Sequence, residues 1–143
     1  MLINREYDVK NLIDENDSNN VLYGPVLLLK RRFLEMMYKH FSDSKDFERK
    51  EEFENYKKEK GKELYNLCLF EVLLEKHPEE SFWRYWRDGT SDINSEATIR
   101  FSKTYSSRVD FYAYCHWLAD KQIKEVQALS KKLGMKLGLY TDM

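Results

Sequence analysis

A long stripe of buried-type side chains near the end of the sequence constrains the fold more than any other feature. Only Ser130 interrupts this stripe, and a second apolar stripe runs beside it. The spacing alternates between three and four residues, which predicts an α-helix at about 107–133 that is buried on more than one side. Ser107 and Asp110 predict a capping box at its start, and Gly134 predicts its end. The stripe consists of Val109, Tyr112, His116, Ala119, Ile123, Val126 and Leu133.

The last ten residues, GMKLGLYTDM, follow a different pattern from the helix before them. Met135, Leu137 and Leu139 alternate with polar residues or glycine, which predicts a single β-strand at 135–140. An isolated strand leaves its backbone donors and acceptors unpaired, so this strand would require partners from elsewhere. A long helix followed by a glycine and a strand is half of a βαβ unit.

The rest of the sequence predicts a mainly α-helical chain. Residues 1–20 are polar and predict a poorly ordered leading segment, whereas residues 21–133 form a helical region. Residues 42–61 are mostly charged and predict a surface helix, and residues 62–78 are the most apolar and predict a central one. The expected helices lie at about 25–41, 45–60, 62–77, 80–87, 93–104 and 107–133.

Composition and charge exclude several classes of function. The 143 residues suit one domain, and five Gly and two Pro argue against an all-β fold. A net charge of −1 with interspersed signs gives no field to attract nucleic acid or an anionic membrane. No stretch approaches the roughly 20 apolar residues of a membrane span, and the N-terminus lacks a signal-peptide layout, so we expect a cytoplasmic location. No phosphate loop or Cys-x-x-Cys motif is present, so no cofactor is expected.

Three groups of residues invite a chemical interpretation. His116 next to Cys115 suggests a metal site, but adjacent helical residues diverge by about 100° and no second ligand has suitable spacing, so packing is favoured and no metal is expected. The sequence FWRYW, residues 82–86, could stack on sugar rings through Trp83, Tyr85 and Trp86, although such residues more often anchor a helix to a core.

The third group is Tyr140 with Asp142, which would emerge from the carboxyl end of the predicted strand. α/β barrels place their functional groups at this edge. Asp142 could equally be an ordinary turn residue, and one carboxylate cannot carry glycoside chemistry alone.

Residues 109–143 resemble the amylomaltase family of 4-α-glucanotransferases, also called disproportionating enzymes. The family pattern contains Phe-Tyr, Trp-Leu-Ala, Gln, Gly-Met and Gly-Leu-Tyr-x-Asp-Leu in this order, while His116 stands where many relatives have Gln. Residues upstream, from Tyr23 onward, resemble the family more loosely. The matching residues here are Phe111-Tyr112, Trp117-Leu118-Ala119, Gln122, Gly134-Met135 and Gly138-Leu139-Tyr140-Thr141-Asp142-Met143.

The resemblance implies a fragment of a (β/α)₈ barrel enzyme, namely a helical insertion plus one terminal barrel strand. Such an enzyme transfers α-1,4-glucan segments between maltooligosaccharides by a retaining double displacement that uses two carboxylates. The family's nucleophile lies in an Arg-x-Asp motif farther downstream, whereas Arg108-Val109-Asp110 lies inside the long helix. We therefore expect Tyr140 and Asp142 to line the glucan site, and the chain alone to be inactive. It is expected to self-associate through the terminal strand or an exposed helix face.

Two alternatives remain open at this stage. The chain can be an autonomous helical interaction module in which the charged helix 42–61 and the apolar stripe form a groove for a partner. It can also be a naturally truncated, non-catalytic relative of the enzyme family.

Overall fold

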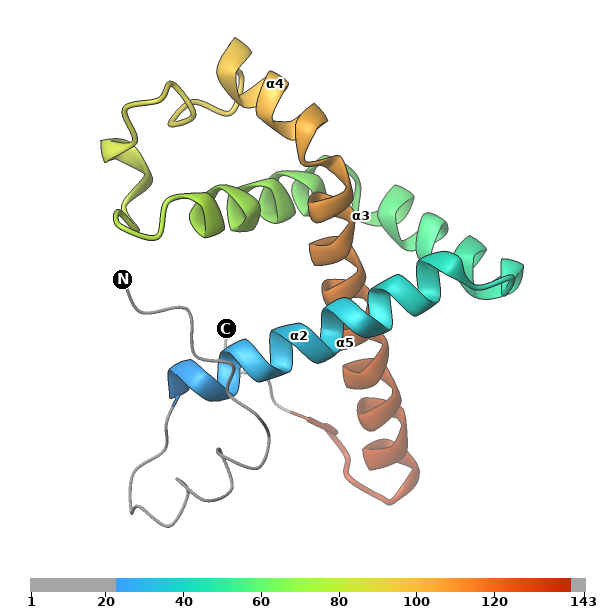
Figure 1. The fold of residues 1–143 in the computed structure, drawn as a ribbon. Helices are drawn as coiled ribbons and strands as arrows, with labels where there is room; N and C mark the ends of the chain where they lie inside the picture. Colours follow the sequence, from blue (N-terminus) through green and yellow to red (C-terminus); the bar gives the residue numbers. More distant parts are fainter. Residues whose placement is uncertain (1–22, 140–143) are drawn as a thin grey trace. The chain divides into compact units, whose positions relative to one another are not determined.

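The computed structural model of the protein describes residues 23–139 (Figure 1). These residues are mainly helical and contain no strand. The chain divides into two units, residues 1–45 and 46–143, and only the first contains α2. The elements are α2 (Tyr23–Asp43), α3 (Phe47–Lys76), the 3₁₀-helix η1 (Trp83–Tyr85), α4 (Glu96–Thr104) and α5 (Ser106–Lys132).

Helix α3 bends at Gly61. The sequence predicted helices at 45–60 and 62–77, and the structure has helical segments on both sides of Gly61, which itself takes a non-helical φ of 58° and ψ of −138°. Residues with a Cβ rarely adopt a positive φ, so a glycine is suited to this bend. Asp46 begins the helix by accepting a hydrogen bond from the Arg49 amide at 3.0 Å.

The core of the second unit forms where α3 crosses α5 (Figure 1). Because of the bend, both parts of α3 contact the first half of α5. From the first part, the Phe53 ring packs against Tyr114 and Trp117, with centroid distances of 6.2 and 5.6 Å. From the second part, Glu75 binds Arg108 through two hydrogen bonds of 2.8 and 2.7 Å.

The predicted capping box at Ser107 and Asp110 is wrong. Helix α5 begins at Ser106, and its N-cap residue Tyr105 makes no side-chain capping bond. Only Tyr105 separates α4 from α5, and its carbonyl accepts hydrogen bonds from the amides of Arg108 and Val109. Ser107 therefore lies within the first helical turn, and Asp110 accepts a hydrogen bond from another helix instead.

The region between α3 and α4 contains less helix than the pattern predicted. A helix was expected at 80–87, but only η1 is present, and α4 begins at Glu96 rather than near 93. Side chains replace helical hydrogen bonds here: the Glu80 carboxylate accepts from the Phe82 amide, and the Glu80 carbonyl accepts from the Trp86 indole. Such local bonds compete with helix formation.

The end of α5 follows the predicted signal, but the strand after it does not form in the described residues. Gly134 has φ 96°, and the amides of Gly134 and Met135 bond back to Lys131 and Ser130, which is a Schellman motif. Residues 135–139 then have neither strand nor helix. Without a neighbouring strand, their backbone bonds to α5 through the Gln127 amide, which pairs with the backbone on both sides of Gly138.

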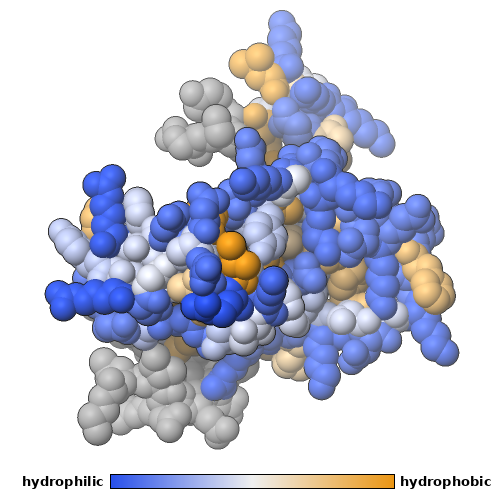
Figure 2. Space-filling view, turned by 90° about the horizontal axis from the view of Figure 1, so that it is seen from above, coloured by the Kyte–Doolittle hydropathy of each residue, from blue (hydrophilic) through white to orange (hydrophobic). Residues whose placement is uncertain are grey.

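The apolar stripe is exposed in the second half of α5, contrary to the expectation of a helix buried on more than one side. Ile123 and Val126 are exposed, as is Leu133 just after the helix, whereas Ser130 is buried. Figure 2 shows a viewed face of mostly hydrophilic side chains with small apolar groups between them. Among the helices that the structure describes, none combines the length and apolarity needed to cross a bilayer.

Candidate functional site

The residues predicted to bind glucan, Tyr140 and Asp142, lie outside the described residues. The predicted family-motif residues fall on and just after α5. Phe111 and Trp117 are buried in the core, Tyr112 is partly buried, and Gln122 is exposed. Gly134 and Gly138 both have positive φ, and a Cβ at Gly138 would lie 2.6 Å from the Gln127 amide. Within the described residues, these motif positions serve packing and chain direction.

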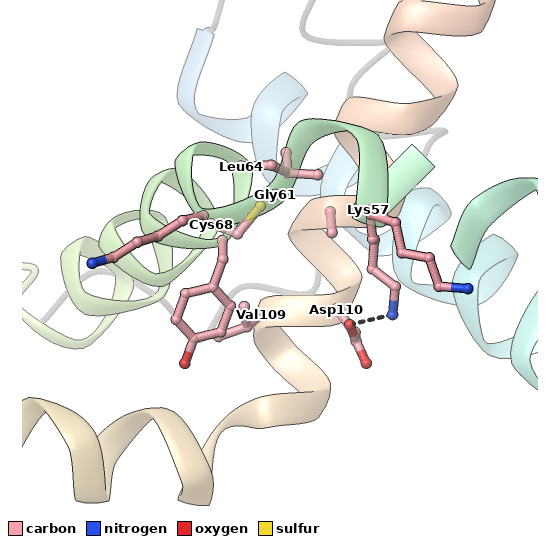
Figure 3. Close-up of a pocket in the computed structure, with 10 residues that line it drawn as sticks. Lys57, Gly61, Leu64, Cys68, Val109 and Asp110 are labelled. Carbon is pink, nitrogen blue, oxygen red and sulfur yellow. Dashed lines mark hydrogen bonds and ion pairs between the residues drawn. The ribbon is translucent and has the colours of Figure 1, made fainter. Parts of the chain in front are cut away.

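A pocket of about 470 Å³ lies beside the bend of α3 (Figure 3). Gly61 and Cys68 line it from α3, and Val109 and Asp110 line it from α5. The Lys57 ammonium lies 3.1 Å from the Asp110 carboxylate and 2.8 Å from Glu54. Although burial lowers the pKa of Lys57, its hydrogen bonds to these two carboxylates raise it overall, so this lysine stays charged.

The residues that line this pocket do not include the pair of carboxyl groups that glycoside chemistry uses. Lys57, Lys58 and Lys62 line it together with a single carboxylate, Asp110. Retaining enzymes require two carboxyl groups about 5–5.5 Å apart. The pocket therefore does not supply the acid and nucleophile of such a reaction.

Three possible metal ligands meet between α3 and α5. The ligand atoms of Cys68, Glu71 and His116 lie within 4.8 Å of one another. However, burial raises the pKa of the Cys68 thiol to about 12, which favours the protonated form rather than the thiolate that binds zinc. The Nε2 atom of His116 lies 3.2 Å from the Glu71 carboxylate. We interpret this group as packing and hydrogen bonding, and it involves Cys68 rather than Cys115, the neighbour in sequence.

The members of the FWRYW cluster differ in their relation to a second pocket, which has a volume of about 480 Å³. Trp86 is buried, and its ring stacks on His77 at a centroid distance of 4.5 Å. Trp83 also lines the pocket but is 40% exposed. Tyr85 is 66% exposed and does not line the pocket. The expected packing role therefore applies to Trp86, whereas Trp83 lines the pocket and stays partly exposed.

The loop behind this pocket is held by charged and hydroxyl groups. His77 lies 3.1 Å from Asp88, and the Thr90 hydroxyl donates to Asp88 at 2.6 Å. Burial raises the pKa of Asp88, but the hydrogen bonds from Thr90 lower it more, so Asp88 is held as a carboxylate. The loop is thus fixed by a network rather than by helix.

Comparison with known proteins places the chain in a family. A sequence model of the family described as 4-alpha-glucanotransferase matches residues 2–143. The chain therefore belongs to the 4-alpha-glucanotransferase family, which confirms the resemblance found in residues 109–143. The 4-alpha-glucanotransferase of Haemophilus influenzae is 32% identical over 137 residues, which cover 89% of this chain and 20% of that protein. The chain thus spans about a fifth of the length of this curated relative. No solved structure matches the chain significantly.

Sequence reasoning missed the contacts that join α3 to α5. The pair of Lys57 with Asp110 and the group of Cys68, Glu71 and His116 join residues far apart in sequence. The spacing of three between Cys68 and Glu71 was visible and places both on one helix face. The position of the partner helix was not visible, so His116 could not be added to them.

Proposed function

We propose that this chain is part of a 4-α-glucanotransferase that transfers α-1,4-glucan segments between maltooligosaccharides. The observation that carries this proposal is the family match over residues 2–143, supported by the 32% identical relative. The reaction is a retaining double displacement in which one carboxylate forms a covalent glucosyl intermediate and a second acts as acid and then base. The chain contributes the helical insertion and, at 135–140, one strand of a (β/α)₈ barrel.

Within this enzyme, Tyr140 and Asp142 line the glucan site, and the catalytic carboxylates lie downstream of the chain. Two features support the assignment of the catalytic carboxylates to a region downstream of the chain. The chain holds a single Arg-x-Asp sequence, and its Asp110 is engaged by Lys57 within the helical core. The pocket at the bend of α3 lacks a second carboxylate among its lining residues. The isolated chain is therefore inactive.

The test compares Asp142→Asn with Asp43→Asn in a longer protein that continues past Met143. Asp43 is an exposed carboxylate at the end of α2, so its replacement controls for loss of one charge. Transfer from maltotriose is followed by the appearance of glucose and longer maltooligosaccharides. We expect a loss of at least tenfold with Asp142→Asn and no change with Asp43→Asn. Equal rates for the two variants would refute a role of Asp142 at the glucan site.

We also propose that the isolated chain self-associates through the exposed stripe of α5. Ile123, Val126 and Leu133 leave apolar surface in contact with water, and burial of such surface favours association. Light scattering should give a mass above that of the monomer, and Val126→Asp should lower it. Ala128→Asp adds the same charge to another face of the helix and should not. A monomeric wild-type chain would contradict this proposal.

A further inference from the structure

The pocket lined by Trp83 has a lining suited to an uncharged, partly polar ligand. It lies along the second part of α3 and the loop that follows, and its volume of about 480 Å³ falls within the usual range of roughly 300–1,000 Å³ for ligand sites. Asp92 is the single charged residue among those that line it. The pocket at the bend of α3 has three lysines by contrast. The Trp83 pocket therefore favours hydroxyl groups over ionic ones.

Three aromatic residues line this pocket, Phe70, Trp83 and Trp86. The Trp86 ring is fixed because its indole donates to the Glu80 carbonyl at 2.8 Å and stacks on His77 and Phe70. Trp83 keeps 40% of its surface exposed. A partly exposed indole in an aromatic lining offers a flat apolar face to a ligand.

The same pocket has polar lining residues. Asn66 comes from α3, and Ser91 and Asp92 come from the loop. An amide, a hydroxyl and a carboxylate together donate and accept hydrogen bonds. A pyranose ring suits both kinds of lining residue, because its C–H face is apolar and its hydroxyl groups lie around the edge.

The loop that carries Ser91 and Asp92 is already ordered by hydrogen bonds. The Ser95 hydroxyl donates to the Gly89 carbonyl at 2.6 Å, and the Thr98 hydroxyl donates to the Asp92 carbonyl at 2.7 Å. Thr98 is completely buried. A ligand that enters this pocket would therefore lose little free energy in ordering the loop.

We propose that the Trp83 pocket is an accessory binding site for an α-1,4-glucan segment, separate from the residues that carry out transfer. Trp83 stacks on one glucose ring, and Asn66 and Asp92 bond to its hydroxyl groups. The choice of an α-1,4-glucan rests on the proposed function, because the transferase would act on such chains. The pocket holds a single carboxylate, so it binds glucan and does not cleave it.

The test measures binding of maltoheptaose to the 143-residue chain by calorimetry and by tryptophan fluorescence. The sequence has three tryptophans, and Trp86 and Trp117 are buried, so an acrylamide quencher reaches mainly Trp83. We expect maltoheptaose to protect Trp83 from quenching, and cellohexaose, which has β-1,4 links, to bind more weakly. No protection by maltoheptaose at millimolar concentration would overturn the proposal.

Matched variants separate the pocket from its surroundings. Trp83→Ala should weaken maltoheptaose binding roughly tenfold, because it removes the stacking ring. Tyr85→Ala removes an exposed aromatic residue two positions away that does not line the pocket, and it should bind like the wild type. Asn66→Ala removes one polar residue of the lining and should also weaken maltoheptaose binding. Circular dichroism shows whether each variant keeps its helices, and equal affinities of folded Trp83→Ala and Tyr85→Ala would overturn the proposal.

The outcomes distinguish this inference from the proposed function. Transfer activity of the longer protein is assayed separately with maltotriose, which is too short to require an accessory site. If transfer occurs but the chain does not bind maltoheptaose through Trp83, this inference fails and the proposed function stands. If Trp83 binds maltoheptaose and the longer protein transfers no glucan, the binding pocket stands and the proposed function fails.

Discussion

The two halves of α5 have the same spacing of apolar residues and opposite environments. In the first half, Trp117 is 4% exposed and packs against Phe53 from α3. In the second half, Ile123 is 52% exposed and Leu133 is 75% exposed. A periodic stripe therefore predicts which face of a helix can be buried, but it does not predict what covers that face.

The bend of α3 explains the difference. Gly61 turns α3 so that both of its parts contact α5, and their side chains reach from Arg108 to Lys121 of that helix. The last of these contacts is an exposed ion pair, in which Lys121 binds Glu52 at 2.9 Å. Beyond this point, Ile123 and Val126 of the stripe are 52% and 48% exposed.

The largest expected contrast comes from truncating one side chain in each half. Trp117→Ala should lower the free energy of unfolding by about 3–5 kcal/mol, because it removes a buried aromatic ring and leaves a cavity. At protein concentrations low enough to keep the chain monomeric, Ile123→Ala should change it by less than about 1 kcal/mol, because the side chain is half exposed and alanine favours helix. Urea denaturation followed by circular dichroism measures both.

Similar losses for the two variants would break the comparison. A large loss with Ile123→Ala would mean that the second half of α5 is covered in solution. If a second copy of the chain covers this half, the urea concentration at the midpoint of unfolding should also rise with protein concentration.

A smaller contrast is expected between ion pairs in the two halves. Arg108 binds Glu75 with two hydrogen bonds, and both side chains are about three-quarters buried. Arg108→Ala should therefore lower the free energy of unfolding by about 1.5–3 kcal/mol, because it also leaves Glu75 without this partner. Lys124 pairs with Asp120 at 2.7 Å in the second half, but Lys124 is mostly exposed, so Lys124→Ala should leave the stability nearly unchanged. Equal losses in urea denaturation would show that burial does not set the strength of these pairs.

Much of the fold could be predicted from local pattern, and the errors have a common cause. Gly134 ends α5 as predicted because glycine adopts the positive φ of this position without the strain that a Cβ would cause. The predicted helix at 80–87 was wrong because Glu80 bonds to nearby groups, which aromatic spacing does not reveal. The predicted strand at 135–140 depends on partner strands, and residues 135–139 bond to Gln127 in their absence.

The sites depend still more on tertiary position. The family resemblance came from ordered motifs in residues 109–143 and was confirmed by the family match. The roles of Tyr140 and Asp142 remain predictions. The sequence shows Trp83 and Trp86 as one aromatic cluster, but it does not show that both line a pocket in which Trp86 is buried and Trp83 is partly exposed. That separation depends on where the loop meets α3.

The smallest expected effect concerns pH and lies at the edge of the buried half of α5. The hydrogen bond to Glu71 raises the pKa of His116 above its ordinary value of 6.5, while burial opposes this shift. Since the folded pKa is raised, the stability that His116 contributes is present below about pH 6.5 and is lost as pH rises through the folded pKa. The neighbouring Cys68 thiol stays neutral in this range because burial raises its pKa to about 12. Urea denaturation at a series of pH values should therefore show the wild type gaining on His116→Gln as pH falls from about 8 to 5.5. Glu71→Gln should remove this gain because it removes the carboxylate that stabilises the imidazolium, whereas a gain that persists in Glu71→Gln would assign the pH dependence to another group.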